Sequence, residues 1–308
     1  MDSLLELLEK LRETEGAIAR LEKAILEYPD SPTLISSLKS LRKRQQHLEA
    51  IFADISHRQS LDVCTYRLFT EQDSRPTLKS LSSTLLSFQE LYTLVYDALK
   101  HGPKVKSQVS AEVAANTAFG FAYTISGSIG VVLTMPNERL LIGETMLEEA
   151  IIMLFDMVKA STSTQIANFA QKVGVAPIRK MYTWAWNQVQ AGLGSEIQWR
   201  RKQEVRASLF IQPPELEALE RAIAATSEEV EDTFEFTGRL IGADIKAHTF
   251  HIEYEGADIR GKMSENIGLE ASVELPRLYK AKITKRTKIH YALEKEDVNY
   301  FLISLNPC

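Results

Sequence analysis

Residues 1–58 read MDSLLELLEKLRETEGAIARLEKAILEYPDSPTLISSLKSLRKRQQHLEAIFADISHR, and they hold the most regular pattern in the chain. Apolar side chains recur at intervals of three and four residues on both sides of the break at Pro29 and Pro32. Such a narrow stripe predicts helices that pack against other helices. We therefore expect an antiparallel coiled-coil hairpin, whose seam is formed by Leu4, Leu7, Leu11, Ile18, Leu21, Ile25, Leu34, Leu38, Leu41, Leu48, Phe52 and Ile55.

The sequence leaves two partners open for this seam. An isolated pair of helices buries little apolar surface and gains most of its stability from tertiary packing. The hairpin can pack on a second copy of the chain or on another protein's helices, or it can pack on its own body. We favour a homo-oligomer.

The composition excludes several classes of protein. The chain has 308 residues, enough for two or three domains, and a formal net charge of −5 argues against a surface coated for nucleic acid. Cys64 and Cys308 are too few for a disulfide framework or a zinc site, which fits a reducing cytoplasm. The start of the chain lacks the basic region of a signal peptide, and no apolar run reaches the ~20 residues of a membrane helix. We expect a cytoplasmic protein with no membrane partner.

Residues 59–227 predict a central α+β domain with a mostly antiparallel sheet, because strands and helices do not alternate regularly. The polar stretch at residues 104–116 is interpreted as a flexible loop. Trp184 and Trp186 are interpreted mainly as core, with one exposed tryptophan as a candidate partner anchor. The expected elements are a strand at 61–69, a helix at 78–101, a β-hairpin at 117–136, helices at 144–160, 162–172 and 175–191, strands at 196–203 and 205–211, and a helix at 215–225.

Residues 228–308 predict a separate domain, a small β-barrel of the SH3-like or OB-like kind. About five short strand patterns are separated by glycines such as Gly242 and Gly256. The run TGRLIGADIKAHTFHIE at residues 237–253 resembles the start of small β-barrel modules in uncharacterised bacterial proteins, some of them encoded in mobile-element or defence loci. That resemblance implies a bacterial accessory protein and supplies no site.

Motifs for catalysis are missing from the sequence. The segment ISGSIG is neither a nucleophile elbow nor a dinucleotide-binding loop, and no phosphate-binding P-loop occurs. His248 and His251 are three apart in a predicted strand, so they point to opposite faces and do not suit one metal. The acidic pairs are interpreted as solvated surfaces. We name no catalytic, cofactor or metal residue, and the pattern leans away from an enzyme.

One basic stretch is a candidate polyanion-binding surface. In YKAKITKRTKIH, residues 279–290, a strand would place Lys280, Lys282, Arg286 and Lys288 on one face and the apolar residues on the other, with Lys285 at a bulge. Such a face could follow a phosphate backbone. The alternative is an ordinary outward face of the barrel, balanced by acids.

Three functional hypotheses follow. The preferred one is a non-enzymatic assembly or regulatory protein that oligomerises, or docks a partner's helices, through residues 1–58, as an accessory component of a bacterial mobile-element or phage-defence system. The second is a nucleic-acid-binding accessory protein that uses the basic strand. The third is a hydrolase or nuclease whose site assembles only in three dimensions.

Overall fold

The computed structural model describes residues 4–70, 76–125, 129–137, 145–202, 204–264, 267, 274–292 and 296–308, without the side chains of residues 4, 5 and 296. Within these residues the chain is a mixed α/β protein with eight helices and two sheets. It divides into two compact units, Met1–Ala225 and Thr226–Cys308. None of the helices in the described ranges is both long enough and apolar enough to cross a bilayer.

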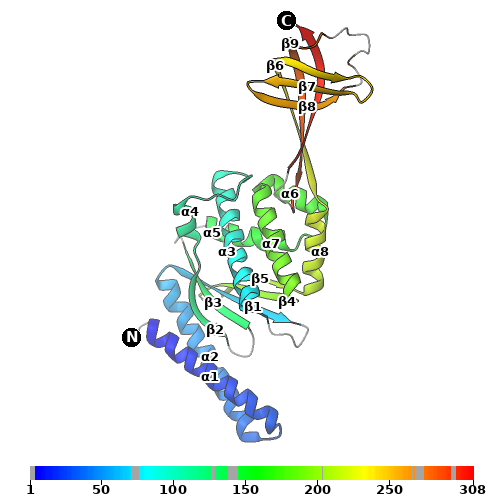
Figure 1. Ribbon diagram of the computed structural model, residues 1–308. Coiled ribbons are helices and arrows are strands. Elements are labelled where there is room, and N and C mark those ends of the chain that lie inside the picture. The colour runs from blue at the N-terminus through cyan, green and yellow to red at the C-terminus, as the bar shows by residue number, and fades with distance from the viewer. Residues whose placement is uncertain are drawn as a thin grey trace. The chain divides into compact units, whose positions relative to one another are not determined.

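Helices α1 (Leu4–Glu27) and α2 (Pro32–Arg58) form the expected N-terminal hairpin and contact one another along their length. Ser31 is the N-cap of α2, and Pro32 occupies its first turn, where a missing backbone N–H costs nothing. The two helices belong to the same compact unit as the central sheet. Their contacts with the sheet are made to β1, β2 and β4, so one end of the hairpin rests on the body (Figure 1).

The central sheet has the strand order β2-β3-β1-β4-β5, and all its neighbouring strands are antiparallel. Its strands are β1 (Leu61–Thr70), β2 (Gly120–Ile125), β3 (Ile129–Pro136), β4 (Leu193–Arg201) and β5 (Glu204–Ile211). The hairpin at 117–136 is confirmed as β2 and β3, while its expected turn at residues 126–128 lies outside the described residues.

Helices cover one face of this sheet, and α1 and α2 lie against the other face (Figure 1). The covering helices are α3 (Leu78–His101), α5 (Met146–Val158), α6 (Ser163–Val173), α7 (Val175–Ala191) and α8 (Pro213–Ala224). Tyr66 of β1 and Trp184 of α7 meet in this layer, where the indole Nε1 donates to the tyrosine oxygen at 3.0 Å. Both side chains are fully buried.

The expected loop at residues 104–116 contains a short helix, so that prediction was wrong in part. Helix α4 (Ala111–Thr117) begins at Ser110, whose hydroxyl accepts the backbone N–H of Val113 at 3.2 Å. Val113 is buried, which anchors the helix to the body. The cap and the buried valine favour a helix here, and Gln89 of α3 also donates to the backbone carbonyl of Thr117 at 2.9 Å.

The second unit is a closed five-stranded barrel with the order β10-β8-β7-β6-β9. Its strands are β6 (Ser227–Asp244), β7 (Thr249–Tyr254), β8 (Ala257–Met263), β9 (Arg277–His290) and β10 (Glu296–Pro307). Phe236, Leu240, Ile252 and Ile283 contribute to its apolar core. Strands β6 and β9 pair along their whole shared length, from Ser227 opposite His290 to Leu240 opposite Arg277.

Candidate functional site

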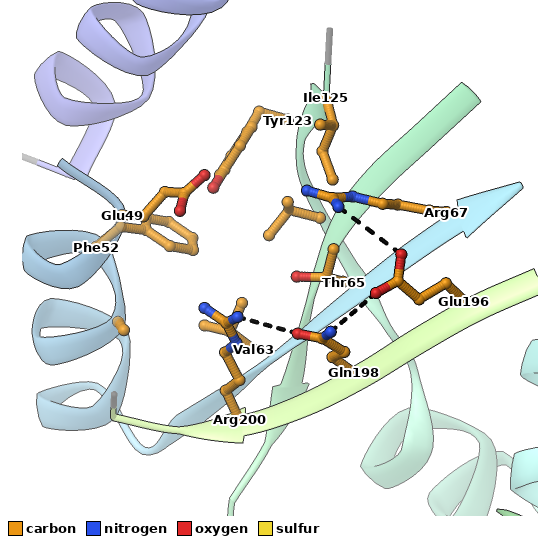
Figure 2. Close-up of a pocket in the computed structure, with 12 residues that line it drawn as sticks. Glu49, Phe52, Val63, Thr65, Arg67, Tyr123, Ile125, Glu196, Gln198 and Arg200 are labelled. Carbon is orange, nitrogen blue, oxygen red and sulfur yellow. Dashed lines mark hydrogen bonds and ion pairs between the residues drawn. The ribbon is translucent and has the colours of Figure 1, made fainter. Parts of the chain in front are cut away.

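A polar cavity lies between the hairpin and the face of the central sheet that α1 and α2 cover. Its volume is about 140 Å³. Helix α2, three neighbouring strands and β2 all contribute side chains to its wall (Figure 2). The lining residues are Glu49, Phe52, Ala53, Val63, Thr65, Arg67, Tyr123, Ile125, Val132, Glu196, Gln198 and Arg200.

The two-residue period of the strands explains why polar groups gather here. Residues 63, 65 and 67 of β1 point to the hairpin side, whereas Tyr66 points to the helices. Strands β1 and β4 are paired so that Thr65 lies opposite Gln198 and Arg67 opposite Glu196. Neighbouring strands therefore place two arginines, an amide and a carboxylate on one patch of the sheet.

A chain of polar contacts crosses the floor of the cavity (Figure 2). Arg200 donates to the Gln198 Oε1 at 2.9 Å, and Gln198 donates to the Glu196 Oε1 at 2.9 Å. Glu196 forms a longer ion pair with Arg67, at 3.8 Å. These contacts hold the side chains in place and use only part of the hydrogen-bonding capacity of the two guanidinium groups, each of which has five N–H donors.

Both cavity arginines keep a buried donor without a partner. Among the described residues, nothing accepts a hydrogen bond from the Nε of Arg67 or from the Nε of Arg200, although solvent does not reach either atom. A buried donor left unpaired costs about 1–3 kcal/mol. A ligand in the cavity would therefore have to bind the terminal N–H groups of the two arginines, since it cannot reach the Nε atoms.

The hairpin supplies the opposite polar group. Figure 2 shows the carboxylate of Glu49 and the hydroxyl of Tyr123 pointing toward one another across the cavity. Burial raises the pKa of Glu49 above its ordinary value; Arg200 counteracts part of that shift, and Glu15 adds to it. Burial, helped by the charges of Glu49 and Glu15, also raises the pKa of Tyr123. The nearby arginines thus offset only part of the cost of burying the negative charge of Glu49.

The lining limits the chemistry that the cavity can perform. It contains no histidine, cysteine or lysine, and its two carboxylates make no hydrogen bond to Thr65. A nucleophile needs such a base within hydrogen-bond reach. Two guanidinium groups facing a carboxylate suit the binding of a small charged molecule better than a covalent reaction.

A second charged cluster lies on the helix side of the sheet and is internally satisfied. Asp62 accepts from the Trp199 Nε1 at 3.0 Å and from the Asn137 Nδ2 at 2.7 Å, and it pairs with Arg201. Arg201 also donates to Glu148 at 2.9 Å. Burial raises the pKa of Asp62, although Arg201 opposes the shift. Because every carboxylate here has cationic or N–H partners, we interpret this cluster as a structural link between β1, β4 and α5.

The predicted basic residues lie on β9, beside acids of β6. Lys280 and Lys282 both pair with Glu235 at 3.4 Å, and Arg286 pairs with Glu231 at 2.6 Å. Lys288 lies opposite Glu229 on β6 and Asp297 on β10. Cross-strand carboxylates thus balance the positive face.

The expected bulge at Lys285 was wrong. The pairing of β6 with β9 is unbroken through this position, so Lys285 shares a face with Ala281 and Ile283. Ala281 and Ile283 are buried, whereas every residue from 284 to 290 is only partly buried. Lys285 is tolerated on the inward-facing side of β9 because this part of the strand lies beyond the closely packed interior of the barrel.

The seam residues of the hairpin fall into two groups. Leu7, Leu11, Ile18, Leu48 and Phe52 are buried, and all of them except Ile18 join a core with Val63, Tyr123 and Val132 of the sheet. Ile55 is partly buried against that core. Leu4 lies outside the described side chains. The seam residues of the far half are only half-buried, namely Leu21, Ile25, Leu34, Leu38 and Leu41.

The remaining candidates do not form a site. No group of three metal-ligating side chains that could hold a metal ion occurs in the described part of the chain. His248 lies in the turn before β7 with a positive φ of 49°, whereas His251 is in the strand and contacts Asp258 at 3.2 Å. Trp184 is buried and Trp186 is 43% exposed, so Trp186 is the exposed tryptophan that the sequence left open.

Sequence reasoning missed the cavity. Arg67 and Arg200 are far apart in the chain, and polar residues that alternate along a strand are typical of a solvent-facing side. The alternation of Val63, Thr65 and Arg67 with apolar neighbours was the available signal, but only the pairing of β1 with β4 brings the arginines together.

Comparisons with known proteins give no relative. No family model matches the chain, and neither a curated protein nor a solved structure shows a significant match.

Proposed function

We propose that this chain is a non-enzymatic assembly protein that associates with a second copy of itself through the far half of the α1–α2 hairpin. One observation carries the proposal: the far end of the hairpin, its tip, exposes large apolar side chains outside the half-buried seam, and nothing in the described chain covers them. Leu26 is 84% exposed, Tyr28 is 65% exposed and Ile35 is 50% exposed.

The contrast along the hairpin supports this role. At the near end, Leu11 and Phe52 are at most 1% exposed because the sheet packs on them. At the far end the same heptad pattern continues with only two helices to share it. A coiled-coil seam of this kind is normally completed by further helices, as in a four-helix bundle.

The charges of the two helices favour a second copy as the partner. The exposed charges of α2 include a basic cluster, whereas α1 carries more acids than bases. An antiparallel pair of hairpins brings α1 of one copy beside α2 of the other, where opposite charges meet. In the far half, the residues concerned are Lys39, Arg42, Lys43 and Arg44 on α2 and Glu27 on α1, and Arg42 also pairs with Glu22 within one copy.

The other parts of the chain complete the proposal. The assembled coiled coil would hold two central sheets, and the C-terminal barrel, of an SH3-like or OB-like kind, would act as an adaptor. The resemblance of residues 237–253 to modules of bacterial mobile-element and defence loci supports an accessory role in such a system. The acids that balance Lys280, Lys282 and Arg286 make assembly the better-supported function over nucleic-acid binding.

The test is to measure the mass of the full chain by light scattering. The native chain is compared with a variant changed at the exposed residues of the tip, Leu26, Tyr28 and Ile35. Deleting residues 1–58 is unsuitable because it would expose Val63, Tyr123 and Val132. The triple variant Leu26→Ser, Tyr28→Ser and Ile35→Ser removes only exposed apolar groups. Leu86→Ser on α3, where Leu86 is 59% exposed, is the matched control.

We expect a dimer or a larger oligomer for the native chain and for the control, and a monomer for the tip variant. A native chain that stays monomeric at high concentration would contradict the proposal. So would a tip variant that retains the native mass.

A further inference from the structure

The cavity between α2 and the sheet presents charged groups of both signs. Its arginines hold two buried N–H donors without an acceptor, and these belong to Arg67 on β1 and Arg200 on β4. Its carboxylate, Glu49 on α2, faces the cavity from the hairpin side (Figure 2). A ligand that satisfies both ends must carry an oxyanion and a positively charged or N–H donor group.

The overall charge of the site favours a zwitterion over a simple anion. Among the four charged lining residues, Glu196 pairs with Arg67, and Arg200 is the cation that lowers the pKa of Glu49 most. The charged groups facing the cavity thus balance, so a molecule with net charge would leave one group unpaired. The side chains of Arg67 and Glu196 are 43% and 33% exposed, so water lowers the cost of an unpaired charge at that pair. A zwitterion adds one partner for each sign.

The remaining wall is apolar and sets the size of the ligand. Phe52 and Ala53 of α2, together with Val63, Ile125 and Val132 of the sheet, line it. The volume of about 140 Å³ is comparable with the roughly 150 Å³ of an engineered cavity that holds benzene. A molecule of about eight non-hydrogen atoms with a branched aliphatic group fits that space.

We propose that this cavity binds a free amino acid with a small branched aliphatic side chain. Its carboxylate would accept from Arg67 and Arg200, its ammonium group would face Glu49, and its side chain would lie against Phe52, Val63 and Val132. Guanidinium groups bind carboxylates through paired N–H donors, which gives orientation as well as affinity. This inference does not depend on the oligomeric state.

The first experiment is calorimetric titration of the full native chain with four probes. L-valine and L-leucine carry both charged groups, 3-methylbutanoate lacks the ammonium group, and isobutylamine lacks the carboxylate. We expect at least one of the two amino acids to bind, and both truncated probes to bind at least about tenfold more weakly, since each lost charged hydrogen bond removes about that factor.

Variants then locate the site. Arg200→Gln and Glu49→Gln should each weaken binding of the amino acid about tenfold or more. Arg42→Gln is the matched control, because Arg42 is 59% exposed in its side chain and pairs with Glu22 on the hairpin, away from the cavity lining. It should leave binding unchanged. Circular dichroism confirms that each variant folds, and the four-probe comparison needs no variant at all.

Three results would overturn the inference. The first is that neither amino acid binds at concentrations up to about 10 mM, because a dissociation constant above that value would be too weak for a specific site. The second is that 3-methylbutanoate binds as tightly as the amino acids, which would make the cavity a simple anion site. The third is amino-acid binding that folded Arg200→Gln and Glu49→Gln variants retain in full.

Discussion

Gly174 connects α6 to α7 in a conformation that side chains resist. Its φ is +87°, and a Cβ at this position would lie 2.2 Å from the backbone N and O of Lys104. Those two backbone atoms are fixed by hydrogen bonds to Val173 and Ala176, at 2.9 Å each. An added side chain would therefore strain the backbone of residue 174, and the backbone of Lys104 could move away only by breaking its hydrogen bonds.

We predict that Gly174→Ala lowers the free energy of unfolding by more than about 2 kcal/mol, measured by urea denaturation. Gly192→Ala is the control, because Gly192 has a φ of +61° with nothing within 4 Å of the added Cβ. It should cost only about 1 kcal/mol, the penalty of the left-handed conformation itself. Equal costs at the two sites would contradict the role given to the contact with Lys104.

Asp97 links stability to pH. Burial raises the pKa of this carboxyl, but an ion pair with Lys104 at 2.7 Å and a hydrogen bond with His101 at 2.6 Å outweigh burial and hold its pKa below the ordinary value. A carboxyl with a lowered pKa stabilises the fold above the unfolded value of about 3.9, and that contribution is lost as the pH falls through the folded value. Asp97 therefore favours the folded state at neutral pH and ceases to do so in acid.

We predict that Asp97→Asn is less stable than the native chain at neutral pH and that this difference shrinks as the pH falls below about 4. Urea denaturation of both proteins across that range measures it. Asp54→Asn, at an exposed position of α2, is the control for the substitution itself. A difference between native and Asp97→Asn that is constant with pH would show that the effect is steric.

At the scale of elements, the two ends of the hairpin should respond differently to the same kind of change. Phe52 is 1% exposed, and its ring meets Tyr123 edge-on with centroids 5.6 Å apart. Phe52→Ala should cost about 3–5 kcal/mol of unfolding free energy. Leu26→Ala at the tip should change the stability of the monomer by less than about 0.5 kcal/mol.

Denaturation at low protein concentration checks this pair, because dimerisation then contributes little. Similar costs at Phe52 and Leu26 would mean that the tip is as well packed as the base. That result would remove the ground for a docking surface at the far end.

The neutralised face of β9 gives a prediction about polyanions. Removing two acids by Glu231→Gln and Glu235→Gln leaves Lys280, Lys282 and Arg286 without their cross-strand partners. The double variant should bind single-stranded DNA more tightly than the native chain at low salt, with an affinity that falls as salt is added. Fluorescence anisotropy measures the affinity for DNA. Glu217→Gln on α8 is the control, because it replaces an exposed glutamate of the other unit by glutamine. Tight binding by the native chain, lost on neutralising Lys280 and Lys282, would instead favour the nucleic-acid hypothesis.

Most elements could be predicted from the sequence because their signals are local. The periodic apolar residues of α3 and the glycines after α6 and α7 mark helices and their ends without reference to the rest of the chain. Helix α4 was missed because its local signals are a capping serine and one buried valine, while its contact with Gln89 of α3 forms only in the fold. The closed barrel was expected from strand count, but its closure rests on the short parallel pairing of β10 with β8, at Phe301 and Leu302.

The cavity could not be predicted in the same way. Its residues come from α2, β1, β2, β3 and β4, so the site exists only after the sheet has formed. The seam of α1 and α2 was visible, yet the sequence gives no sign of where along the hairpin the contact with the sheet ends. The position where that contact ends depends on how far the face of the folded sheet extends along the hairpin.

At the scale of the whole molecule, the two units have separate cores and should unfold separately. Trp184, Trp186 and Trp199 all lie in the first unit, so tryptophan fluorescence reports on that unit alone. Ile252 is fully buried in the barrel. Ile252→Ala should shift the part of the circular-dichroism transition that comes from the barrel and leave the fluorescence transition unchanged. A parallel shift of both signals would show that the units unfold as one.

The position of β1 in the central sheet has a consequence for synthesis on the ribosome. β1 is the middle strand, but its partners β3 and β4 begin at Ile129 and Leu193, long after β1 itself has been made. Until then both edges of β1, together with Leu11 and Phe52 on the hairpin, lack the surfaces that later cover them. A nascent chain with unpaired strand edges and exposed apolar groups is prone to wrong association. Slow translation between β1 and β4 would thus endanger this protein, and holding chaperones would be needed most while that segment is being made.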